Sequence, residues 1–146
     1  MDFPVFYGGE TVGSVTLKRE GLYAVLSTRC RRFAGGVQRL WGVRSLRVDA
    51  LGVLAPEGGA LCLRRRISAH ALPEMPEHFL AGRAENGWLP WRGELAGEEI
   101  PSGWVREDQS AVAVPFSEDL PVVCFEHATE LTPVTICGVL CLCLSI

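Results

Sequence analysis

The chain has 146 residues, a mass of 15.9 kDa and a formal net charge of −3 at pH 7. This length fits one domain or two very small ones, and it allows an apolar core without disulfides or metals. Hydrophobic residues make up 48% and charged residues 21%, which excludes disordered, collagen-like and coiled-coil chains. Sixteen glycines and nine prolines favour short strands joined by tight turns.

The first half of the chain has the pattern of successive β-hairpins. The polar run Lys18-Arg19-Glu20-Gly21 predicts a turn with Gly21 at positive φ, and residues 55–59 predict a second turn. Residues 22–27 are apolar on both faces, which is typical of a central strand. Strands are predicted at residues 12–17, 22–27, 39–43, 46–50 and 61–67.

The middle of the chain, residues 68–103, is expected to be an irregular segment rich in proline, glycine and tryptophan. Prolines and glycines interrupt every periodic pattern here. We expect one helical turn at residues 76–80, brief strands around Trp88 and Trp104, and otherwise loops that cover sheet edges.

Strand patterns return near the end of the chain, at residues 111–114, 122–125 and 134–144. The last segment is apolar on both faces, so it is predicted to be one buried central strand with a bend or bulge at Gly138. Because no stretch has helical periodicity, the expected fold is mainly β, a small barrel- or sandwich-like body of short antiparallel strands. The predicted core comprises Val15, Leu17, Leu22, Ala24, Leu26, Leu61, Leu63, Val112, Val114, Ile136, Leu140 and Leu142.

Charge is unevenly distributed along the chain. Residues 1–66 carry eleven basic and five acidic side chains, whereas residues 67–146 carry three and twelve. We treat residues 1–146 as a single compact domain, with a basic hairpin-rich lobe at 1–67 and an acidic lobe at 68–146 as the alternative. The hypothesis that follows is that the two parts meet, within one molecule or between copies. If the contact is between copies, the arginines at positions 29, 31, 32 and 64–66 are expected to face carboxylates of a neighbour such as Glu98, Glu99, Glu107 and Asp108.

The six cysteines and three histidines form no metal or catalytic motif. The sequence has no C-x2-C pair, nucleophile elbow, phosphate loop or H-E-x-x-H. Cys124 and His127 are three residues apart, which places them on opposite faces of a strand, while a long-range pair such as Cys30 with His127 stays open. We therefore predict no enzyme, no metal and no cofactor. The cysteines interpreted as core thiols are Cys137, Cys141 and Cys143.

Two sets of side chains carry the remaining functional signals. If the hairpins lie side by side, six arginines form a basic stripe, which suits a phosphate backbone, although the pI of about 5.6 argues against a dedicated nucleic-acid binder. Three tryptophans either anchor the fold by burying large areas, which we favour, or stack on sugars or bases. These possible interaction residues are Arg29, Arg31, Arg32, Arg64, Arg65, Arg66, Trp88, Trp91 and Trp104.

These signals favour a non-catalytic intracellular interaction or scaffold module that binds a protein partner or a second copy of itself. The alternative is a ligand-binding β module that holds single-stranded nucleic acid through the arginines or carbohydrate through the tryptophans, and nucleic acid is the less favoured partner. The first residues lack the pattern of a secretory signal, and the longest apolar run, residues 134–146, is too short for a membrane helix. We therefore expect a cytoplasmic protein with no membrane contact.

Overall fold

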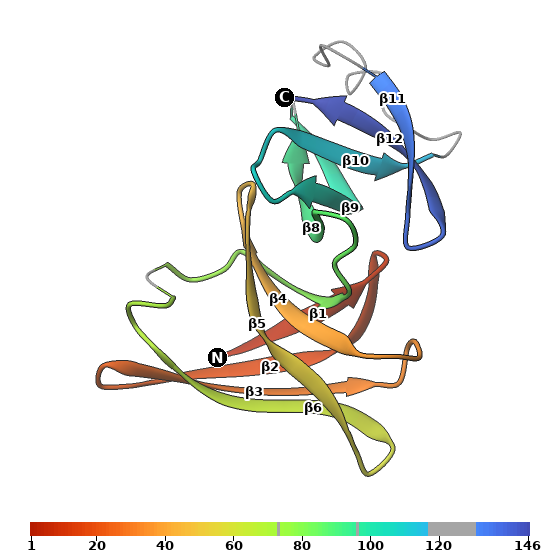
Figure 1. The fold of residues 1–146 in the computed structure, drawn as a ribbon. Coiled ribbons are helices and arrows are strands. Elements are labelled where there is room, and N and C mark those ends of the chain that lie inside the picture. The colour runs from red at the N-terminus through yellow and green to blue at the C-terminus, as the bar shows by residue number, and fades with distance from the viewer. Residues whose placement is uncertain (73, 96, 117–130) are drawn as a thin grey trace.

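The computed structural model describes residues 1–72, 74–95, 97–116 and 131–146, and its regular elements are strands (Figure 1). The strands form two bodies, a closed seven-stranded barrel and a five-stranded sheet. The mainly β prediction and its barrel form are confirmed. Among the described residues, no helix has the length and hydropathy that a membrane span requires.

The barrel contains the first seven strands in the order β1-β2-β3-β6-β5-β4-β7. Neighbouring strands are antiparallel except at the closure, where β1 and β7 run parallel and pair through Val5 with Phe79 and Phe6 with Leu80. Alternate side chains of the strands fill the barrel interior, as the strand period requires. The strands are β1 (Asp2–Tyr7), β2 (Glu10–Glu20), β3 (Tyr23–Arg31), β4 (Gln38–Arg44), β5 (Arg47–Glu57), β6 (Ala60–Ser68) and β7 (His78–Gly82).

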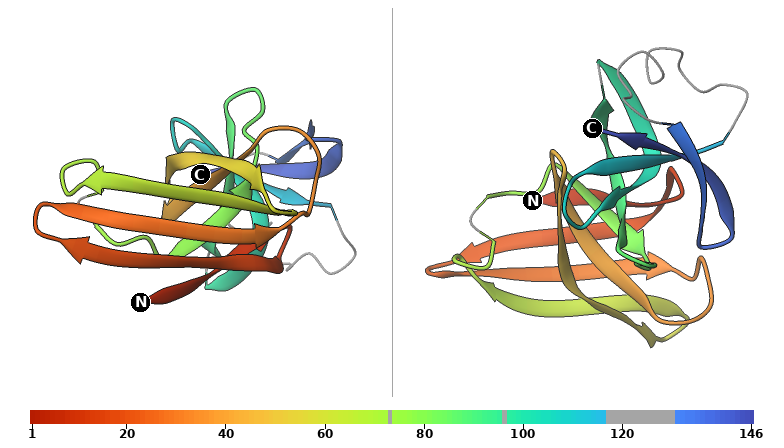
Figure 2. Two further views of the ribbon diagram at one scale, coloured as in Figure 1. Left: turned by 90° about the horizontal axis from the view of Figure 1, so that it is seen from below. Right: turned by 45° about the horizontal axis from the view of Figure 1, so that its top comes forward.

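The second body is an antiparallel sheet with the order β11-β12-β10-β9-β8. Its edge strand β8 contacts β7, β4 and β5, so the sheet stands on that side of the barrel, and β3 and β6 lie on the opposite side (Figures 1 and 2). One apolar cluster crosses this junction and includes Trp41 and Leu80 from the barrel and Trp91 from the sheet. The strands are β8 (Trp88–Leu95), β9 (Glu98–Arg106), β10 (Ala111–Pro115), β11 (Leu131–Ile136) and β12 (Val139–Ser145).

The first predicted hairpin exists, but its turn is shorter than expected. Glu20 pairs with Tyr23, so the turn has two residues, Gly21 and Leu22, and Gly21 has a φ of 64°. Leu22 therefore projects from the turn and is 79% exposed, which makes its core assignment wrong. Leu140 is also exposed, and Leu63 and Leu142 are half-buried. The other eight predicted core residues are buried.

The single strand predicted at residues 134–144 is wrong, because this segment is a hairpin. Ile136 pairs with Val139, and Cys137 and Gly138 form the turn between them, with φ of 49° and 77°. Positive φ at both turn residues is the geometry of a type I′ hairpin, whose twist matches that of the flanking strands. Gly138 is thus a turn residue rather than a bend. The strand predicted at residues 122–125 lies outside the described residues.

The middle segment, residues 68–103, is more regular than expected. The helical turn predicted at 76–80 is wrong, because His78–Gly82 extends as β7 and pairs with both β4 and β1. Prolines did not prevent strands here, since Pro90 lies on edge strand β8 and Pro101 lies opposite the bulge in β8. The barrel ends at Gly82 and the second sheet begins with β8, whereas the sequence places the boundary between the two lobes after residue 67.

Candidate functional site

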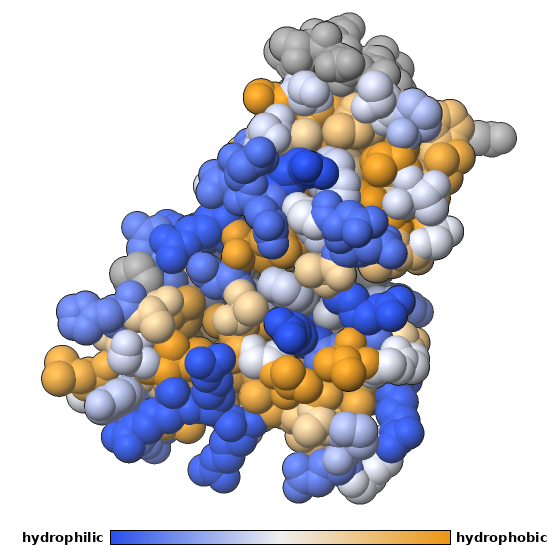
Figure 3. Space-filling model, in the orientation of Figure 1, coloured by the Kyte–Doolittle hydropathy of each residue, from blue (hydrophilic) through white to orange (hydrophobic). Residues whose placement is uncertain are grey.

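Five cations project from the outer surface of β2, β3 and β6. β3 and β6 pair along their whole length, which sets Ser27 opposite Arg64 and Val25 opposite Arg66. The alternate residues of these strands point into the barrel, so the arginines point outward. Figure 3 shows hydrophilic side chains along this lower edge of the barrel. We call this surface the basic face, and it comprises Lys18, Arg29, Arg31, Arg64 and Arg66.

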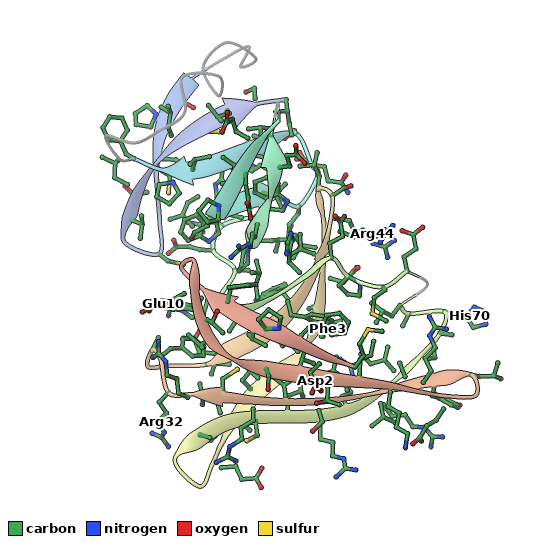
Figure 4. The ribbon with its side chains drawn as sticks, turned by 180° about the vertical axis from the view of Figure 1, so that it is seen from behind. Asp2, Phe3, Glu10, Arg32, Arg44 and His70 are labelled. Carbon is green, nitrogen blue, oxygen red and sulfur yellow. The ribbon has the colours of Figure 1, made fainter. Side chains whose placement is uncertain are left out.

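Arg65 has a different role from its neighbours, because it lies at an inward position of β6. Its Nη1 donates a hydrogen bond to the backbone carbonyl of Leu51 at 2.8 Å. Leu51 is the extra residue where the pairing of β4 and β5 shifts register, so its carbonyl lies at a bulge. Arg65 therefore supports the barrel rather than the basic face. Arg32 is exposed and lies just after β3, at the same end of the barrel as Glu10 (Figure 4).

Among the described residues, the two parts of the chain meet through one ion pair, Arg44 Nε with Glu74 Oε2 at 2.7 Å, but the arginines of the basic face do not take part in it. β3 and β6 lie on the side of the barrel away from the second sheet (Figures 1 and 2). Arg31 pairs with Glu10 of the barrel at 3.4 Å, and Glu99 pairs with Arg92 of its own sheet at 3.3 Å. Within the described ranges, no ion pair joins the basic face to Glu98, Glu99, Glu107 or Asp108. The contact between copies stays a prediction.

The tryptophans lie on strands, and two of them anchor the second sheet. Trp88 and Trp91 are buried, with 5% and 1% of their surfaces exposed, so neither is an open stacking platform. Trp91 donates its indole N–H to the carbonyl of Ser45 across the junction. Trp104 is half-buried on β9. The anchoring interpretation therefore holds for Trp88 and Trp91.

A polar cleft lies at the junction of barrel and sheet, with a volume of about 710 Å³. Its floor is fixed at the β4–β5 turn, where Ser45 has a φ of 50° and donates its backbone N–H to Glu77 Oε1 at 3.0 Å. Arg92 stacks over the Phe6 ring at 3.9 Å while it pairs with Glu99. The polar and charged lining residues are Ser45, Glu77, His78, Arg92, Glu94 and Glu99.

His78 lines this cleft, and its surroundings lower its pKa. Partial burial lowers the pKa of His78, and the positive charge of Arg92 lowers it further, while Glu77 and Glu99 oppose the shift. The imidazole is therefore mainly neutral at pH 7. With three glutamates against one arginine, the lining is acidic, and it offers mostly hydrogen-bond acceptors.

Burial keeps two of the described thiols, Cys30 and Cys141, in the protonated form. Burial, with a smaller effect of Cys62, raises the pKa of Cys30 to about 11, and burial also raises the pKa of Cys141 to about 11. These values leave little thiolate at neutral pH. Cys141 fits the core-thiol interpretation, whereas Cys137 lies in a turn. Cys124 and His127 lie outside the described residues, so the Cys–His pairs that involve them stay untested.

Sequence reasoning missed the polar cleft because its residues come from separate elements. Ser45 lies in the β4–β5 turn, His78 begins β7, and Arg92 lies on β8. None belongs to a local motif, and only the contact between the two bodies brings them together. In the part of the chain that the structure describes, no three His, Cys, Asp or Glu side chains gather as metal ligands.

Comparison with protein-family models, curated proteins and solved structures found no match. The class of protein is therefore defined by its own architecture, a closed β-barrel joined to a five-stranded antiparallel sheet.

Proposed function

We propose that this chain is a non-catalytic interaction module whose basic face binds an acidic protein surface, including that of a second copy. The supporting observation is that the pairing of β3 with β6 gathers separate runs of arginine on one surface. Arg29, Arg64 and Arg66 have no carboxylate ion-pair partner among the described residues. Their charges are thus available for a complementary surface, which would steer association.

The composition at one end of the basic face favours a protein partner over nucleic acid. The Arg66 guanidinium lies 4.3 Å from the centre of the Tyr23 ring. Tyr23 directly follows the β2–β3 turn, where Leu22 is 79% exposed. Arginine and tyrosine are enriched at protein interfaces, where they supply most of the binding energy. The net charge of −3 also disfavours a polyanion as the main partner.

A second copy of the chain offers the acidic surface that this proposal needs. Glu98 begins β9, and Glu107 and Asp108 lie in the exposed β9–β10 turn, on the body far from the basic face. A contact between two different surfaces is head-to-tail, so it closes into a ring or continues as a filament.

The chemistry of the thiols supports a non-catalytic role in a reducing compartment. The raised pKa values of Cys30 and Cys141 keep these thiols protonated, so they are poor nucleophiles. The described cysteines are all free, which fits the cytoplasm that we propose as its location.

Light scattering across ionic strength tests the proposal. We expect the wild-type protein to associate at low salt and to dissociate above about 0.1 M, where screening acts over roughly 10 Å. The double variant Arg64→Ala/Arg66→Ala should stay monomeric, and Arg39→Ala, an exposed arginine on β4, should behave as wild type. A monomer at every salt concentration contradicts self-association. Salt-sensitive retention of a single-stranded oligonucleotide, lost in the double variant, would assign the basic face to nucleic acid instead.

A further inference from the structure

β6 leaves part of one edge without a strand partner among the described residues. β5 and β6 are joined by a tight turn, but their pairing covers only Ala55–Glu57 with Ala60–Cys62, and the two strands then diverge (Figures 1 and 2). On its other side β6 pairs with β3 along its whole length. The rest of β6, from Leu63 to Ser68, therefore has a strand beside it on one side only within the ranges that the structure describes. We call this stretch the open edge of β6.

The backbone groups of Arg64 and Arg66 face the open edge. A two-residue turn joins β5 to β6, so Glu57 and Ala60, which flank it, exchange both of their backbone hydrogen bonds. Alternation along β6 then directs the N–H and C=O of every second residue after Ala60 away from β3, and these residues include Arg64 and Arg66. The two-residue turn between β2 and β3 leads to the same assignment, since it directs the backbone groups of Arg65 toward β3.

The same two residues carry their side chains on the basic face. Arg64 and Arg66 are exposed, and neither belongs to an ion pair in the described part of the chain. A strand added antiparallel to β6 would place the residues opposite them on this outer surface, with Cβ atoms about 4.5–5.5 Å apart. Opposite charges at such positions attract each other, so carboxylates at alternate positions of the added strand suit this edge.

The charges on the edge also determine which strands it accepts. Charged side chains commonly protect exposed strand edges, because like charges prevent two copies of an edge from pairing. Arg64 and Arg66 act in this way against a second β6 edge, but they attract a strand that carries negative charge. The outer edge of β11 is different, because alternation from the Cys137-Gly138 turn puts Pro133 at an edge-facing position, where it has no N–H to donate.

We propose that the open edge of β6 binds an extended acidic segment of a partner protein as an added antiparallel strand. The backbone groups of two alternate acidic residues bond to those of Arg64 and Arg66, and their carboxylates pair with the two guanidinium groups. The residue between them lies on the inner side, against the methylene stem of Arg65, whose head group is held by the Leu51 carbonyl. This inference rests on the function proposed above and adds to it the form of the partner and its way of binding.

Titration with the peptide Thr-Glu-Val-Glu-Thr, capped at both ends to remove the terminal charges, tests the proposal by NMR at the backbone amides. The same peptide with N-methyl groups on both glutamates keeps its charges but loses two N–H donors, and we expect it to bind roughly tenfold more weakly. The peptide N-methylated only at the valine, whose N–H points away from β6, is the matched control and should bind as the unmodified one. The peptide with glutamine in place of both glutamates should bind more weakly, and its affinity should not depend on salt.

Amide hydrogen exchange tests the edge itself. In the free protein, the amides of Arg64 and Arg66 should exchange fast, whereas those of Arg65 and Ile67, which bond to β3, should be protected. Saturation with Thr-Glu-Val-Glu-Thr should slow exchange at Arg64 and Arg66 severalfold, because their N–H groups then donate to the peptide.

Four outcomes overturn the added strand. They are slow exchange at Arg64 and Arg66 in the free protein, no saturable binding of Thr-Glu-Val-Glu-Thr, equal binding of the peptide methylated at both glutamates, and equal binding of the glutamine peptide. If the methylated peptide binds equally and Arg64→Ala/Arg66→Ala binds neither, the basic face holds acidic segments through side chains alone, and the proposed function stands. If Arg64→Ala/Arg66→Ala binds the unmodified peptide as wild type does, the proposed function is contradicted as well.

Discussion

The indole N–H of Trp91 donates a hydrogen bond of 2.7 Å to the backbone carbonyl of Ser45. Trp91 belongs to the second sheet and Ser45 to the barrel, so this bond joins the two bodies directly. Ser45 is held from the other side by Glu77, which accepts its backbone N–H. The polar cleft depends on this arrangement, because Ser45 lines it.

Trp91→Phe should destabilise the protein by about 1–3 kcal/mol, because it leaves the Ser45 carbonyl without a partner and removes buried surface. Urea unfolding followed by circular dichroism measures the loss. Trp104→Phe is the control, and its effect should be smaller, since Trp104 is half-buried and belongs to no hydrogen bond across the junction that the structure describes. Equal losses in the two variants would contradict the role of the Trp91 bond.

Arg65→Ala should cost about 1–3 kcal/mol of stability, since the Leu51 carbonyl at the bulge loses its donor. Arg64→Ala, one position away on the outer surface, should change stability by no more than about 0.5 kcal/mol. Association at low salt should show the opposite order, with Arg64→Ala the more damaging. A stable Arg65→Ala protein that fails to associate would move Arg65 onto the basic face.

Gly13→Ala should be among the most damaging single substitutions, at about 3 kcal/mol. A Cβ at Gly13 would lie 2.6 Å from the Cys30 Cα and would also clash with the Arg29 carbonyl oxygen, and these backbone atoms cannot move aside without disturbing β3. Gly35→Ala is the control, since a Cβ there meets no atom within 4 Å. Thermal unfolding compares the two, and a wild-type melting temperature for Gly13→Ala would show that β2 and β3 are further apart than described.

Stability should fall as the pH drops below about 6.5, the ordinary pKa of histidine. His78 has a lowered pKa in the folded protein, so the unfolded chain binds the proton first and gains from it. The free energy of unfolding begins to fall near pH 6.5. It falls further until the pH reaches the pKa of His78 in the folded protein, and below that pH it levels off. His78→Asn should flatten this slope, whereas His70→Asn, at an exposed position, should keep it. An unchanged slope in His78→Asn would show that other groups cause it.

Local patterns predicted the barrel strands β2 to β6, but they gave no strand at β1, a helical turn in place of β7, and not every turn correctly. The Gly21 turn was found because a glycine follows a polar run, yet the register of Glu20 with Tyr23 depends on pairing across the hairpin. The Cys137–Gly138 turn was missed because cysteine is not a usual residue of a type I′ turn, and the apolar residues on both sides suggested one continuous strand.

The candidate sites were harder to predict, because they depend on contacts distant in the sequence. The basic face could be inferred from arginine runs, and strand alternation sets Arg65 on the opposite face from Arg64 and Arg66, although the sequence analysis grouped all three. The hydrogen-bond partner of Arg65 could not be inferred, since the bulge at Leu51 was not visible in the sequence. Arg92 carried no signal, because its importance comes from the neighbours that the tertiary fold supplies, Phe6 and Glu99.

The parallel pairing of β1 with β7 has a consequence for synthesis on the ribosome. β1 is made first, but one of its two edges waits for a partner until residues 78–82 have been translated and have left the exit tunnel. During that interval the nascent chain has antiparallel hairpins and an open edge, which is the condition in which strands join wrong partners. A chain that stalls before residue 78 lacks the strand that closes the barrel, so we expect it to be recognised by chaperones and to aggregate when released.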